Sequence, residues 1–121
     1  MQVTTLTRRA LDFAVGISLN GVYSPSADTR PAAWFWPKTA GTLFGYTRKC
    51  FEFSSDPKHL ALLLKVAGVG VTLSCSECGW TADLHGRRAT GDTLQIALCR
   101  AIVLRELGSL VEVPDEYQEA A

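Results

Sequence analysis

Apolar residues recur at helical spacing after Thr5 and Thr7, and again after Asp56. Either threonine can cap the first helix, which the turn residues Asn20-Gly21 then end. Asp56 is an N-cap residue followed by proline at the first helical position, where the missing N–H costs nothing. Gly68 stops this second helix. The pattern therefore predicts two helices separated by a long connection.

Between Val69 and His85 the apolar and polar residues alternate, which is the period of half-buried strands. The turn from Ser76 to Gly79 divides this alternation in two and predicts an antiparallel hairpin. A third short strand over residues 87–90 leads directly into the next helical pattern.

The last helix follows Asp92, which is placed to cap it, and Gln95 stands three residues later as a capping-box partner. Gly108 is a natural C′ stop. Residues 111–113 add an edge strand, which Pro114 ends.

These elements predict an α+β fold in which helices pack on a small, mostly antiparallel sheet. One domain spans residues 1–117, because a chain of 121 residues with 47% apolar residues is sized for one core. Residues 118–121 form an acidic tail.

The connection over residues 22–53 is interrupted by prolines and glycines, which exclude a long helix and allow only short strands. It also holds eight of the eleven aromatic residues. Its aromatic rings and cations can stack on a base and neutralise a phosphate. We therefore assign it the candidate ligand-binding residues, with two arginines further along the chain as anion partners: Arg30, Trp34, Trp36, Lys38, Tyr46, Arg48, Arg87 and Arg88. The alternatives are that the aromatics at 34–36 belong to the core and that the two arginines are solvated edge-strand charges.

Twelve basic and twelve acidic residues cancel, so no overall field attracts nucleic acid or an anionic membrane. No apolar run is long enough to cross a bilayer, and the N-terminus lacks the apolar core of a secretory signal. We expect a cytoplasmic protein whose cysteines are reduced.

The pair Cys75-x-x-Cys78 can hold zinc, but a structural zinc site needs four ligands and no second such pair exists. The alternative is a hairpin turn with Cys75 facing the core, and Cys99 is expected as a small core residue. His59 and His85 are expected to be surface residues, and no nucleophile, base and orienting group come together. We predict neither enzyme activity nor a metal or other cofactor.

Several segments resemble the phage NinX-like family, which is grouped with the phage ABA-sandwich domains. They run in order along the chain: Leu6–Val15 with its Ala-Leu-Asp pattern, Phe53–Lys58, Gly68–Val71, Gly79–Ala82, Arg88–Gln95 and Val111–Tyr117. Two features differ from the family's pattern, namely Pro57, where a tryptophan is common, and the Cys75-x-x-Cys78 turn.

The resemblance implies an ABA-sandwich-like fold and a phage accessory protein that acts in the cytoplasm of the bacterial host. By analogy with other small phage proteins, we expect a non-enzymatic, homo-oligomeric binding module that counters defence by sequestering a nucleotide-derived immune signal. The alternative is a protein-protein module that inhibits a host defence protein or assists phage replication or recombination. A small zinc-dependent structural protein is a third hypothesis.

Overall fold

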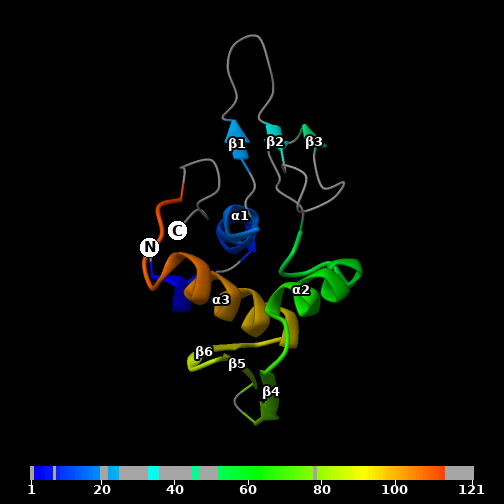
Figure 1. Ribbon diagram of the computed structural model, residues 1–121, viewed down its shortest axis with the longest axis vertical. Helices are drawn as coiled ribbons and strands as arrows, with labels where there is room; N and C mark the ends of the chain where they lie inside the picture. The colour runs from blue at the N-terminus through cyan, green and yellow to red at the C-terminus, as the bar shows by residue number, and fades with distance from the viewer. Residues whose placement is uncertain are drawn as a thin grey trace.

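The structure, a computed structural model, describes residues 2–6, 8–19, 22–24, 33–35, 45–46, 52–77 and 79–113 (Figure 1). In chain order its elements are η1 (Val3–Thr5), α1 (Arg8–Ser18), β1 (Val22–Ser24), β2 (Ala33–Phe35), β3 (Gly45–Tyr46), η3 (Pro57–His59), α2 (Leu60–Ala67), β4 (Val71–Ser76), β5 (Gly79–Leu84), β6 (Arg87–Gly91) and α3 (Leu94–Leu107). These helices and antiparallel sheets confirm the predicted α+β class.

Helix α3 occupies the middle of the molecule. It packs on β5 and β6 on one side and on α1 and α2 on the others (Figure 1). Its buried residues therefore surround the helix instead of forming one stripe: Ala97, Leu98, Cys99, Ala101, Ile102 and Val103. A helix whose buried positions cover most of its circumference is expected at the centre of a core.

The sheet beneath α3 is antiparallel throughout, in the order β4-β5-β6. Leu73 pairs with Ala82, and Ala82 pairs with Ala89, so these positions share the face that α3 covers. The structure thus confirms the predicted hairpin and third strand.

Small residues on this face let the helix approach closely. A Cβ atom on Gly91, at the end of β6, would lie 2.7 Å from the backbone nitrogen of Ala97. Such a contact is shorter than van der Waals packing allows, so a side chain at this position would force α3 away from the sheet.

The helix boundaries follow the predicted signals with one shift. The Asp56 carboxylate accepts the Lys58 N–H at 3.1 Å, which confirms its capping role. Gly68 and Gly108 end α2 and α3 at φ angles of 81° and 89°, as predicted. The cap of α3, however, is Thr93, whose hydroxyl accepts the Ile96 N–H at 3.1 Å. The prediction that Asp92 caps α3 was therefore wrong, by one position.

The predicted ends of the chain need two further corrections. Thr5 lies inside η1 and so does not cap α1, and Thr7 lies outside the described residues. Residues 111–113 form no strand; Leu110 makes an isolated bridge with Gln2, and Val111 and Val113 are buried instead. The predicted acidic tail, residues 118–121, lies outside the described residues.

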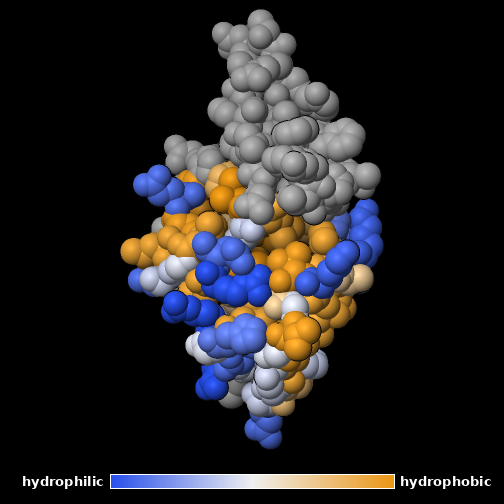
Figure 2. All heavy atoms as spheres, in the orientation of Figure 1, coloured by the Kyte–Doolittle hydropathy of each residue, from blue (hydrophilic) through white to orange (hydrophobic). Residues whose placement is uncertain are grey.

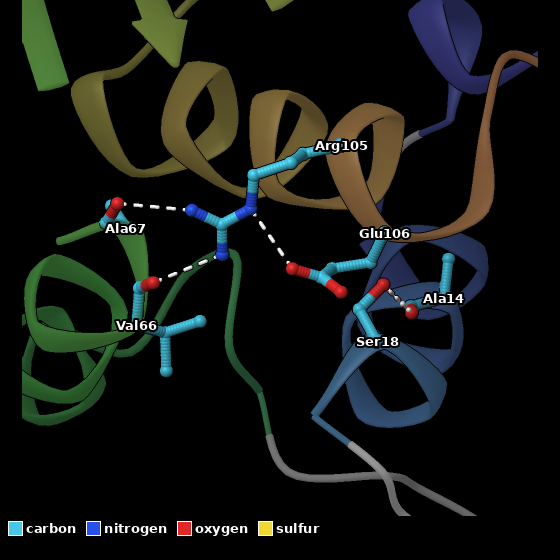
Figure 3. Close-up of polar contacts among 6 residues, drawn as sticks. All are labelled: Ala14, Ser18, Val66, Ala67, Arg105 and Glu106. Atoms are coloured by element: carbon cyan, nitrogen blue, oxygen red, sulfur yellow. Dashed lines mark hydrogen bonds and ion pairs between the residues drawn. The ribbon is translucent and has the colours of Figure 1, made fainter. Parts of the chain in front are cut away.

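Arg105 fastens α2 to α3 (Figure 3). Its guanidinium donates to the carbonyl oxygens of Val66 at 2.9 Å and Ala67 at 3.0 Å, and its Nε donates to Glu106 at 2.9 Å. The last carbonyls of a helix have no partner within it, and a cation there also opposes the negative end of the helix dipole. One side chain thus holds the end of α2 against α3.

Candidate functional site

The aromatic-basic segment of the sequence is described only in part. Arg30, Trp36, Lys38 and Arg48 lie outside the described residues. Trp34 belongs to β2 and Tyr46 to β3, in an antiparallel sheet of order β1-β2-β3. Where the structure describes this segment, at 22–24, 33–35 and 45–46, it has the short strands that the sequence predicts.

The register of this sheet shows which aromatic positions share a face. Trp34 is directly opposite Tyr23 on one side and Gly45 on the other, whereas Tyr46 is opposite Ala33. Trp34 and Tyr46 therefore occupy successive register positions, which belong to opposite faces of a sheet. Tyr23, which was not among the predicted site residues, is the cross-strand neighbour of Trp34.

The two other predicted anion partners lie elsewhere. Arg87 and Arg88 are exposed residues of β6, and α3 and α1 stand between β6 and the β1-β2-β3 sheet (Figure 1). The structure does not bring them together with Trp34 and Tyr46.

Arg88 already has a partner on the neighbouring strand. Its guanidinium donates to one oxygen of Asp83 at 3.2 and 3.3 Å, and the Gly86 N–H donates to the other at 2.8 Å. The Gly86 N–H and the Arg88 guanidinium lower the pKa of Asp83, since both favour the charged carboxylate. Arg88 acts here as a local ion-pair partner on the sheet surface.

A groove opens where the turn 52–56 meets α2 and the start of α3. Its volume is about 360 Å³ and it is lined by Ser54, Ser55, Leu60, Thr93, Leu94, Gln95 and Ile96. Leu60, Leu94 and Ile96 make the walls mostly apolar, and the two serines add hydroxyl groups. Apolar walls with a few placed polar groups are typical of small-molecule sites.

Long-range hydrogen bonds hold the turn that forms this groove. The Gln95 side-chain amide donates to the carbonyl oxygens of Phe53 and Asp56, each at 2.7 Å. The Ser54 N–H donates to the buried Asp12 carboxylate of α1 at 2.8 Å. The turn is therefore tied to both α1 and α3, so the groove is held in shape by the core.

The start of α3 forms one wall of the groove. The Ile96 N–H donates to the Thr93 hydroxyl, and the Ala97 N–H donates to the Thr93 carbonyl oxygen, each at 3.1 Å. The N–H groups of Leu94 and Gln95 also belong to this positive end of the helix dipole. Because Leu94 and Gln95 line the groove, the positive end of the helix dipole lies at its wall.

His59 lies beneath the same turn and is buried, only 7% exposed, which corrects its predicted surface position. Its ring centre is 5.0 Å from that of Phe53. Burial lowers the pKa of His59 by disfavouring the imidazolium, and this outweighs the opposing attraction of Asp56. His85 is exposed in the β5–β6 turn, as predicted.

The cysteines give no metal centre in the part of the chain that the structure describes. Cys75 lies on the face of β4 that points toward α3 but is exposed there, so it is not the core residue that was expected, whereas Cys99 is fully buried, as predicted. Cys50 and Cys78 lie outside the described residues. Among the described residues no three His, Cys, Asp or Glu side chains gather to hold a metal ion.

Sequence patterns did not reveal the groove. The sequence predicts Gln95 as a capping-box residue, and nothing local marks Phe53 and Asp56 as its partners, or Asp12 as the partner of Ser54. The described residues contain no helix long and apolar enough to span a bilayer. The chain matches no protein-family model, and a search of the curated proteins finds no match either.

Proposed function

We propose that this chain is a phage accessory protein that binds a nucleotide-derived immune signal of the host and withholds it, without catalysing a reaction. The resemblance of its segments to the NinX-like family motivates the phage assignment. The binding role is supported by the chemistry of its residues.

The observation that carries the proposal is the register of β1-β2-β3. Trp34 stands on the central strand between Tyr23 and Gly45. A sheet that carries neighbouring aromatic positions is a common platform for stacking bases, and a glycine beside them adds no side chain to that face. The cations of the same segment, such as Arg48, are suited to a phosphate.

Calorimetric titration of a panel of signalling dinucleotides tests the proposal. Trp34→Ala should weaken binding about tenfold to a hundredfold, because stacking contributes about 1 to 3 kcal/mol per base. Trp34→Phe keeps an aromatic face and should retain most of the affinity. Arg87→Ala is the control, since β6 lies on the other side of α3, and it should leave the affinity unchanged.

A further variant separates the sheet from the groove at α3. Ser55 is exposed and lines the groove, so Ser55→Trp fills it. Binding through the sheet should survive this change. If the wild type binds no member of the panel, the nucleotide proposal is wrong; if only Ser55→Trp abolishes binding, the ligand belongs in the groove.

A module that binds a host defence protein or a partner in replication or recombination is the second candidate. It is supported by apolar side chains at the surface, with Leu110 63% exposed beside a shallow groove of about 270 Å³. Phe13, Ile17 and Leu107 also line that groove. Exposed apolar clusters favour protein partners. Two results together would favour this candidate. The wild type would bind no dinucleotide, and a host protein that binds the wild type would bind the Leu110→Lys variant less tightly.

A further inference from the structure

Strand β4 is an edge of its sheet without the usual protection. It pairs with β5 on one side, and no other described strand pairs with its second side. Its six residues, Val-Thr-Leu-Ser-Cys-Ser, contain neither charge nor proline. An edge strand exposes unpaired N–H and C=O groups, and proteins usually guard it with lysine, proline or a bulge. The outer edge of β4 is therefore open to another strand.

The opposite edge of the same sheet differs. Strand β6 carries Arg87 and Arg88, both exposed. In addition, Arg100 of α3 donates to the carbonyl oxygen of Thr90 at 2.7 Å, which occupies a backbone acceptor of β6. Strand β6 therefore has charged side chains at its edge, whereas β4 has none. Of the two edges of this sheet, β4 is the one suited to pair with another strand.

The face beside the β4 edge is also incompletely covered. Helix α3 packs chiefly on β5 and β6, so Val71 and Leu73 are only half-buried and Cys75 is exposed. Val69, just before the strand, is 95% exposed. Figure 2 shows hydrophobic surface running over α2 and on toward β4. Apolar area next to an open edge increases the gain from pairing.

We propose that a second copy of this chain pairs with β4 in antiparallel orientation, with Leu73 opposite Leu73 of the second copy. In this register Val71 lies opposite Cys75, and Thr72 opposite Ser74. Apolar positions meet on the face that α3 covers, and hydroxyl-bearing positions meet on the other. A shift by one residue would set apolar positions against polar ones, so the alternation itself selects the register. The two three-stranded sheets then form one continuous sheet with both α3 helices on the same face.

The charges around β4 favour a second copy as the partner. Glu77 lies in the turn after β4, outside the paired residues 71–75, and in an antiparallel pair the two copies place it at opposite ends, so the two carboxylates do not face one another. The whole chain has twelve basic and twelve acidic residues, and two neutral copies do not repel each other at long range. The strand is thus complementary to itself in its alternation of apolar and polar positions, and no like charges meet between the paired strands.

Sedimentation or light scattering at increasing concentration tests this proposal without any ligand, so its outcome is independent of the proposed function. We expect the wild type to reach twice the 13.1 kDa mass of the chain. If the protein stays a monomer at every concentration up to about 1 mM, any association is too weak to matter, and the proposal is wrong.

Two matched variants locate the interface. Ser74 and Thr90 are exposed and lie in one row across the sheet through Thr81, at its two opposite edges. Ser74→Lys brings two lysines diagonally across the interface, within about 8 Å, and should raise the dissociation constant about tenfold or more. Thr90→Lys adds the same charge at the other edge and should leave it unchanged. A dimer that is weakened by Thr90→Lys and not by Ser74→Lys contradicts the proposal, and circular dichroism checks that both variants fold.

A disulfide tests the register. Directly opposed residues of antiparallel strands have Cα atoms about 4.5 to 5.5 Å apart, which suits a disulfide. Leu73→Cys in a Cys75→Ser background should form a covalent dimer on mild oxidation, whereas Cys75→Ser alone should not. If the dimer persists and Leu73→Cys does not cross-link it, the Leu73-centred register is wrong.

Discussion

Gln95 and Phe53 are joined by a hydrogen bond of 2.7 Å from the Gln95 side-chain amide to the Phe53 carbonyl oxygen, across 42 positions of the chain. The same amide also serves Asp56, and the Cys99 thiol makes a longer contact of 3.5 Å to the Phe53 oxygen. Helix α3 thus supplies polar groups that hold the turn in front of α2, together with Asp12 of α1.

Replacing Gln95 by alanine should destabilise the fold by about 1 to 3 kcal/mol, because two part-buried carbonyl oxygens lose a donor. Gln95→Glu should be worse near neutral pH, since a carboxylate cannot donate to either oxygen. Urea unfolding measures both effects. Gln2→Ala, at an exposed side chain, is the control. Wild-type stability of Gln95→Ala would show that the amide contributes little.

The cap of α3 gives a test between neighbouring residues. Thr93→Ala should cost about 1 kcal/mol, because the Ile96 N–H loses its acceptor, whereas Asp92→Ala should cost clearly less. The comparison of unfolding midpoints decides between them. A larger loss for Asp92→Ala would mean that the aspartate caps the helix in solution.

Arg105 is expected to matter for the junction of α2 and α3. Arg105→Ala removes donors from the Val66 and Ala67 carbonyls and should cost about 1 to 3 kcal/mol. Arg105→Lys should lie in between, because an ammonium lacks the planar fork that reaches both oxygens. Lys65→Ala, an exposed change in the last turn of α2, should stay within about 0.5 kcal/mol.

Burial of His59 predicts a pH dependence of stability. Its pKa is lowered in the folded state below the ordinary 6.5, so the unfolded chain binds a proton first as the pH falls. The contribution of His59 to stability is complete above pH 6.5 and is lost as the pH falls from there toward the folded pKa.

Urea unfolding across this pH range should show stability decreasing as the medium becomes more acidic. His59→Gln should flatten this dependence, while His85→Gln, at the exposed histidine, should keep it. An unchanged slope in His59→Gln would assign the dependence to other groups.

What the sequence determined by itself was local. The Asp56-Pro57 start, the glycine stops at 68 and 108 and the alternation through β4 and β5 were predicted correctly. Each depends on the backbone preferences of a few adjacent residues, so a short window contains the whole signal. The open edge of β4 can also be recognised from its uncharged composition, once its place in the sheet is known.

Tertiary structure decided which of these residues meet. Thr93 and Asp92 are both residue types that cap helices well. Helix α3 follows β6 directly and begins at Leu94, so Thr93 occupies the N-cap position. His59 is buried, and Gln95 bonds to Phe53, because α1, α2 and the 52–56 turn close around α3. The placement of Arg87 and Arg88 far from β2 has the same origin. Such contacts join residues tens of positions apart, and their energy depends on packing that no local pattern encodes.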